Sequence, residues 1–178
     1  SGRKVILASP RKHLLYNKYS QHLSDNLHLY RYQGDKKRYF ENTGNTEKDI
    51  LTFNNELGRY LQSGGRKILT TYDSLGKIQE VLISSGEYLQ EWTVVVDEFQ
   101  SMFCDCQYKA TTEYEFSMIL GMFSTVVYLS ATPFLESYLD MTGQFGGLTV
   151  YELLWPANMT QIPEVEVIKS RKSVACLC

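Results

Sequence analysis

Two adjacent acids, Asp97 and Glu98, follow the apolar run 93–96 directly, and Gln100 comes two residues later. An acidic pair at the tip of a buried strand suits Mg²⁺-assisted phosphoryl transfer, in which one carboxylate holds the metal and its neighbour deprotonates the attacking water. Adjacent residues at a strand end point in different directions, so the two carboxylates can take separate roles. An acidic pair in this place can also be a simple helix cap, and the pair alone leaves both interpretations open.

The segments around the acids alternate between apolar strands and amphipathic helices. We expect strands at 5–8, 67–72, 93–96, 125–129, 148–154 and 164–169, and helices at 11–23, 46–63, 74–84, 112–123 and 134–142. In the first helix, Leu15, Tyr19 and Leu23 share one face. Continuous apolar strands separated by helices predict an α/β fold whose mainly parallel sheet is covered on both faces.

Four of these strands end in polar clusters. The clusters are Ser9-Pro10-Arg11, Thr70-Thr71-Tyr72-Asp73, Asp97-Glu98-Phe99-Gln100 and Ser130-Ala131-Thr132. Ligands of parallel α/β sheets lie beyond the carboxyl ends of the strands. The sequence therefore predicts that all four clusters meet at one edge of the sheet and form a site there.

Two of the segments resemble motifs of the superfamily 2 helicases. Residues 94–100, Val-Val-Val-Asp-Glu-Phe-Gln, are similar to motif II as a DExQ variant of the DEAD/DEAH signature, and residues 126–133 are similar to motif III. The resemblance implies a RecA-like three-layer α/β/α domain that binds ATP and Mg²⁺. It implies that Asp97 holds the metal, that Glu98 is the base and that Gln100 senses the γ-phosphate. Ser130, Ala131 and Thr132 would couple hydrolysis to nucleic acid.

Two upstream segments resemble motifs Ia and Ib of the same family, at residues 5–11 and 69–75. This resemblance implies contacts to a DNA or RNA backbone. Hydroxyls, a helix N-terminus and basic side chains are suitable phosphate partners. The residues that would make these contacts are Ser9, Pro10, Arg11, Lys12, Thr70 and Thr71.

The chain departs from the family in one respect: the phosphate-binding pattern G-x-x-x-x-G-K-[ST] does not occur in it. Gly64-Gly65-Arg66-Lys67 is the nearest match, and it precedes a strand where the loop should follow one. We therefore expect 1–155 to be a partial first motor domain without its phosphate-loop strand, inactive in isolation. Residues 156–178 would lead toward a second RecA-like domain. The alternative is a degenerate motor domain that binds nucleic acid or protein without catalysis.

A missing phosphate-loop strand would also leave residues 125–129 at an apolar sheet edge, where self-association is expected. No apolar run reaches the ~18 residues of a membrane span, and Ser1-Gly2-Arg3-Lys4 leads into a strand without a secretory signal. We expect a cytoplasmic, nuclear or viral-replication setting and no membrane partner. Residues 1–70 hold 13 Lys/Arg and 6 Asp/Glu, whereas 71–178 hold 5 and 14, so the basic half can attract nucleic acid.

Overall fold

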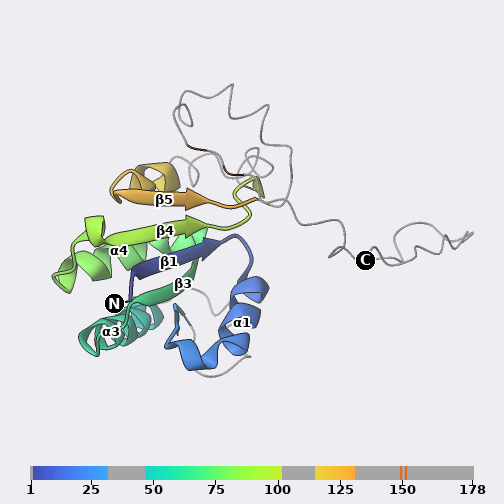
Figure 1. Ribbon diagram of the computed structural model, residues 1–178. Helices are drawn as coiled ribbons and strands as arrows, with labels where there is room; N and C mark the ends of the chain where they lie inside the picture. The colour runs from blue at the N-terminus through green and yellow to red at the C-terminus, as the bar shows by residue number, and fades with distance from the viewer. Residues whose placement is uncertain (1, 32–46, 102–114, 131–148, 150, 152–178) are drawn as a thin grey trace, which may run out of the picture. The chain divides into compact units, whose positions relative to one another are not determined.

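The computed structural model describes residues 2–31, 47–101, 115–130, 149 and 151 (Figure 1). The chain divides into two compact units, Ser1–Tyr138 and Leu139–Cys178. Thr149 and Tyr151 are the described residues of the second unit, so the account below concerns the first. Several predictions fall almost entirely outside the described residues and therefore stay predictions. They are the helix at 134–142, the strands at 148–154 and 164–169, and the domain boundary at 155.

The first unit is built on a five-stranded sheet whose strands are all parallel, in the order β2-β3-β1-β4-β5. The strands are β1 (Lys4–Ser9), β2 (His28–Leu29), β3 (Lys67–Thr71), β4 (Trp92–Val96) and β5 (Thr125–Tyr128). The α/β class with a parallel sheet, which the alternation of elements predicted, is confirmed. The two-residue strand β2 was not predicted, because a segment so short shows no periodicity.

Helices connect these strands. They are α1 (Lys12–Gln21), α3 (Glu47–Gln62) and α4 (Leu75–Ser84), with a further helical segment at 115–120. Single 3₁₀ turns occupy Leu23–Asp25, Tyr72–Ser74 and Leu89–Glu91. The prediction that Leu23 shares a helical face with Leu15 and Tyr19 is wrong, because α1 ends at Gln21 and the following turn leaves Leu23 67% exposed.

The two faces of the sheet are covered by different helices. Leu15 of α1 forms a small core with Leu29 and Leu69, and Leu7 packs against it. The alternate residues Ile6 and Ile68 point to the opposite face and are buried there. The chain moves from β1 to β2 in one direction and then from β2 through β5 in the other. Right-handed crossovers therefore place α1 on one face and the later helices on the other, which gives three layers.

The start of β1 is tied to the start of β4 by a cluster of charged and aromatic side chains. Lys4 Nζ lies 2.6 Å from Glu87 Oε2 and 2.6 Å from Glu91 Oε2. The indole of Trp92, which is fully buried, donates a hydrogen bond of 3.1 Å to Glu87 Oε2. The hydrogen bonds to the two glutamates raise the pKa of Lys4 above its usual value. Because Lys4 is paired with Trp92 in the sheet, this cluster secures the register of β1 against β4.

β5 is the outermost strand of the described sheet. Val127 and Leu129 are 40% and 43% exposed, so apolar surface lies open along this strand. The expected self-association through this edge stays a prediction, since the residues beyond Ser130 fall largely outside the described ranges.

His28 of β2 predicts a specific dependence of stability on pH. Its ring stacks on Tyr60 at 5.0 Å, and burial lowers its pKa from 6.5 to about 4. A pKa lowered on folding means that the unfolded chain binds the proton first. The free energy of unfolding therefore has its full value above pH 6.5, and it decreases as pH falls from 6.5 to about 4. In the natural chain the free energy of unfolding in urea should fall by up to about 3 kcal/mol across this pH range. His28→Phe, which keeps the stacking, should remove that pH dependence. His13→Phe, at an exposed position, is the matched control, and equal slopes in the two variants would contradict the prediction.

Candidate nucleotide and nucleic-acid site

The carboxyl ends of four neighbouring strands meet at one edge of the sheet. Ser9 is the register partner of Thr71. Asp97 donates its backbone N–H to the carbonyl of Ala8 at 2.8 Å. On the other side of β4, Leu129 donates its N–H to the carbonyl of Val96 at 2.8 Å. The predicted meeting of the polar clusters is therefore confirmed for the residues that the structure describes.

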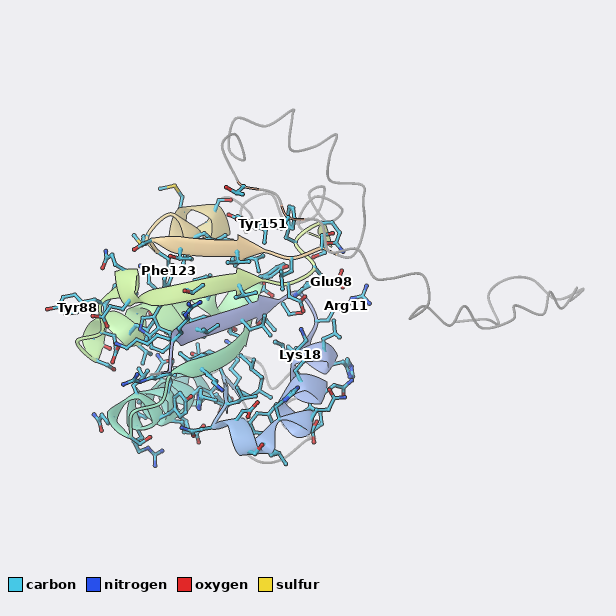
Figure 2. The ribbon with its side chains drawn as sticks, viewed as in Figure 1. Arg11, Lys18, Tyr88, Glu98, Phe123 and Tyr151 are labelled. Carbon is cyan, nitrogen blue, oxygen red and sulfur yellow. The ribbon has the colours of Figure 1, made fainter. Side chains whose placement is uncertain are left out.

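The connections that leave β1 and β4 diverge at this edge, and we call the place between these two strand ends the crevice. The connection after β1 leaves toward β2 through α1, whereas the connection after β4 leaves toward β5. Ligands of parallel sheets bind where adjacent connections diverge in this way. Figure 2 shows Arg11, Lys18 and Glu98 at this end of the sheet, while Tyr88 and Phe123 lie at the opposite end. The crevice thus has basic residues from α1 on one side and the acidic pair on the other.

Asp97 is held in place from several directions. Its side chain is 16% exposed, and Oδ2 accepts a hydrogen bond from Lys18 Nζ at 2.7 Å. Its backbone carbonyl accepts a hydrogen bond from the Tyr72 hydroxyl. The Tyr72 ring packs on Phe116 at 4.7 Å, and burial raises the pKa of its hydroxyl. Neither contact could be predicted from the sequence, because Lys18 lies 79 residues and Tyr72 lies 25 residues before Asp97 in the chain.

Glu98 adopts a left-handed backbone conformation, with φ of 57°. Such a conformation is costly for residues with a Cβ and is concentrated at functional sites. Gln100 donates a hydrogen bond from Nε2 to Glu98 Oε2. The oxygen Oε1 of Gln100 is buried and has no hydrogen-bond partner among the described residues. The turn therefore separates the directions of Asp97 and Glu98 and gives Glu98 a neighbour that orients it.

The residues expected to contact nucleic acid divide into buried and accessible groups. Ser9 and Thr70 are 0% and 1% exposed, so their hydroxyls lie inside the fold in this conformation. Thr71 is half-buried, and its hydroxyl lies 3.2 Å from that of Ser74. Arg11 is exposed. Pro10 and Lys12 are half-buried.

Part of the expected coupling motif can be located. Ser130 is exposed and directly follows Leu129, whose carbonyl accepts the N–H of Phe99 at 3.1 Å. This bond links the end of β5 to the turn that contains Glu98. Ala131 and Thr132 lie outside the described residues.

The acidic pair fits a metal that arrives with a phosphate. Within the described ranges, no group of three or more His, Cys, Asp or Glu could hold a metal ion. Mg²⁺ in phosphoryl-transfer sites takes one or two carboxylates and completes its shell with water and substrate phosphate. Asp97 could supply one such carboxylate, and hydrogen bonds to its main-chain groups fix its position.

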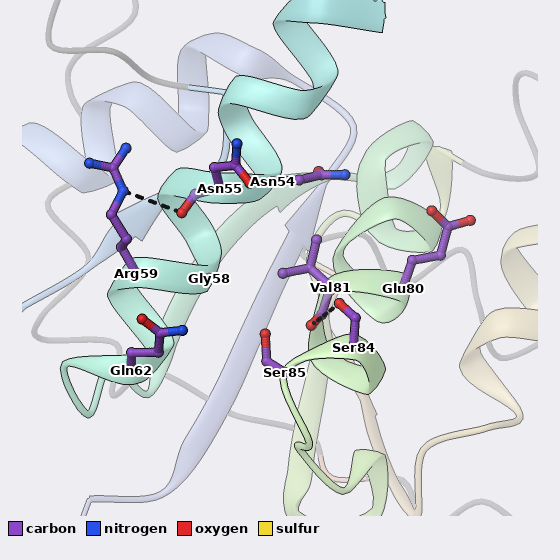
Figure 3. A pocket seen from close by; sticks show the side chains of 9 residues that line it. All are labelled: Asn54, Asn55, Gly58, Arg59, Gln62, Glu80, Val81, Ser84 and Ser85. Carbon is purple, nitrogen blue, oxygen red and sulfur yellow. Dashed lines mark hydrogen bonds between the residues drawn. The ribbon is translucent and has the colours of Figure 1, made fainter.

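A polar groove lies elsewhere in the molecule, between α3 and α4 (Figure 3). Its volume is about 700 Å³, and the residues that line it are Asn54, Asn55, Gly58, Arg59, Gln62, Glu80, Val81, Ser84 and Ser85. These residues come largely from the second halves of the two helices. Since α4 begins after β3 and runs back toward the start of β4, its second half lies away from the edge that carries Asp97. We place the candidate site at the crevice, because it combines charged side chains with the divergent connections.

No protein-family model, curated protein or solved structure matches this chain. Among the described residues, no helix is long and apolar enough to cross a membrane.

The backbone at residue 98 yields a test that requires no ligand. At ordinary positions Gly is less stabilising than Ala by roughly 0.5–1 kcal/mol, whereas a left-handed position penalises Ala by about 1–2 kcal/mol. Glu98→Gly should therefore be more stable than Glu98→Ala by about 1 kcal/mol in chemical denaturation. The same pair of substitutions at Lys67, an exposed strand position, should show the ordinary order. If Ala is the better residue at both positions, Glu98 is not left-handed in solution.

Proposed function

We propose that this chain is part of the first motor domain of an ATP-dependent nucleic-acid helicase or translocase of the superfamily 2 type. One observation carries the proposal: Asp97 and Glu98 stand at the crevice between β1 and β4, with Arg11 at the end of the neighbouring strand. Three segments to which the resemblance assigns roles lie on neighbouring strands of the sheet. The acidic motif on β4 lies between the nucleic-acid segment on β1 and the coupling segment on β5.

In this proposal, hydrolysis divides between the two acids. Bound Mg²⁺ would be held by Asp97 and would offset the charge of the phosphates. Glu98 would accept a proton from the attacking water. The oxygen of that water would form a bond to the γ-phosphorus, while the bond between the γ-phosphorus and the bridging oxygen of the β-phosphate breaks. Gln100, which already donates to the Glu98 carboxylate, would keep that carboxylate aimed at the water. The products are ADP and phosphate, and the second motor domain would complete the site.

The basic start of α1 supports the nucleic-acid part of the proposal. Arg11 precedes the first turn of α1 and is exposed, and Lys12 follows it. A helix N-terminus with adjacent basic side chains favours phosphate oxygens. Contacts of this kind go to the backbone and not to the bases, so binding would be largely independent of sequence.

A non-catalytic module is the second candidate, and two observations favour it. The chain lacks the phosphate-binding loop. In addition, Asp97 already pairs with Lys18, so the expected metal ligand is neutralised by a side chain of the same chain. In this case the crevice would still position α1 for nucleic acid or a protein, without turnover.

Calorimetry with Mg-ATP distinguishes the two candidates. We expect very weak binding to this chain, and firm binding when the natural reading frame is extended upstream by ~60 residues, enough for a strand, a loop and a helix of typical length. In the extended protein Glu98→Gln should leave binding intact and reduce hydrolysis by at least about a hundredfold, because it removes the base and keeps the shape. Absence of binding in both forms would favour the non-catalytic module.

Arg11 provides a separate test of nucleic-acid binding. Arg11→Ala should weaken binding of a fluorescent single-stranded oligonucleotide and reduce the slope of log K against log salt by about 0.7. The loss should be similar for oligonucleotides of different sequence. Arg59→Ala removes the same charge from an exposed position on α3 and is the matched control in the anisotropy assay. Equal losses from the two variants would indicate a general charge effect and would contradict a site at α1.

A further inference from the structure

Lys18 bridges the two walls of the crevice. It belongs to the last turn of α1, which forms one wall, and its ammonium reaches Asp97 at the tip of β4, which forms the other. The distance between Nζ and Oδ2 is 2.7 Å. The Lys18 side chain is 37% exposed and that of Asp97 is 16% exposed. The contact therefore joins elements from opposite sides of the crevice and lies on a carboxylate that is mostly shielded from water.

The two partners differ in their freedom to move. Asp97 has its N–H bonded to the carbonyl of Ala8 and its own carbonyl bonded to the Tyr72 hydroxyl. Its carboxylate sits on a backbone that is fixed on both sides. Lys18 reaches the same point through a flexible four-carbon stem from a partly exposed position. If the contact opens, the lysine leaves and the aspartate stays.

The ammonium and a divalent cation would compete for the same carboxylate. Two cations on one carboxylate repel each other, and a metal that takes Asp97 must offset the loss of the lysine contact. We propose that Lys18 is a tethered counter-ion that occupies Asp97 until a divalent cation displaces it. The inference rests on the proposed function, because that function makes Asp97 the metal ligand.

The surroundings of Lys18 give the displaced ammonium no substitute on its own helix. Residues 12–21 contain no Asp or Glu. The nearest acid after the helix, Asp25, is already 3.4 Å from the ring of His22. Once displaced, the ammonium would be solvated by water or would pair with an anion in the crevice. The metal cation would therefore replace the ammonium as the counter-ion of Asp97.

The experiment measures Mn²⁺ binding at Asp97 directly. Mn²⁺ serves as a paramagnetic substitute for Mg²⁺, and the readout is broadening of the backbone amide signals of Asp97 and Glu98 in the ¹⁵N-labelled full chain. Lys18→Met removes the competing charge and keeps most of the side-chain bulk. Lys18→Arg keeps the charge. Lys77→Met removes one charge from another helix, α4, and Asp97→Asn removes the ligand.

We expect Lys18→Met to lower the Mn²⁺ concentration for half-broadening by up to about fivefold, the range of a single partly exposed ion pair. Lys18→Arg and Lys77→Met should bind as the natural chain does. An equal shift in Lys18→Met and Lys77→Met would overturn the inference, and so would an unchanged affinity in Lys18→Met. If no form shows broadening that Asp97→Asn removes, the metal-binding role of Asp97 fails as well. If Mn²⁺ instead binds at Asp97 with an affinity that does not change in Lys18→Met, only the role of Lys18 fails.

Discussion

The parallel pairing of β1 on both of its sides is the constraint on which the rest of this fold depends. β1 accepts β3 along one edge and β4 along the other, in registers that run from Val5 with Lys67 and from Lys4 with Trp92. A shift of one residue in either pairing would turn the buried Ile6 and Ala8 toward α1 and the wrong face. The same register delivers Ser9 and Asp97 to the same edge. Core packing and site geometry are therefore determined together.

The site combines fixed backbone with adjustable side chains. Around Asp97 the positions are set by bonds between main-chain groups and by the half-buried Tyr72. Glu98 departs from the strand through a left-handed turn, so the two carboxylates leave the sheet in different directions. By contrast, Arg11 directly precedes α1 and Lys18 lies in its last turn, and both basic groups are carried on long, flexible side chains. In the proposed function, carboxylates on a backbone that hydrogen bonds hold in place would thus face basic groups on flexible side chains.

Much of the sheet could be predicted from the sequence. β4 and β5 are runs rich in β-branched residues, and such runs favour strands. The expectation of a buried strand holds for β4, whereas every residue of β5 is half-buried or exposed in the described sheet. The shared edge followed from the same logic, since parallel strands carry their ends to one side. Ser9 and Thr70 show where this logic stops: their polarity indicated an exposed role, but a sheet covered on both faces buries side chains up to the last residue of a strand.

The remaining features depend on contacts that no local pattern encodes. The pair of Lys18 and Asp97 spans 79 residues and depends on the angle at which α1 crosses the sheet. The left-handed turn is formed by Glu98 and not by a glycine, so the sequence does not indicate it. The charged cluster around Lys4 likewise joins residues that lie far apart in the chain and look like ordinary surface charges. For these features the sequence supplies the residue types, and the fold decides which of them meet.

The central position of β1 also affects how the chain can fold. β1 is the first strand along the sequence, and its partners follow 62 residues later in β3 and 88 residues later in β4. Contacts that close such long loops form slowly, and a sheet of this kind has a high contact order. During synthesis the apolar strand β1 would lack its neighbour β3 until residue 71 has left the ribosome, and its neighbour β4 until residue 96 has done so. The earliest stable part of this molecule is therefore more local, and the edge that carries the site is completed late in folding.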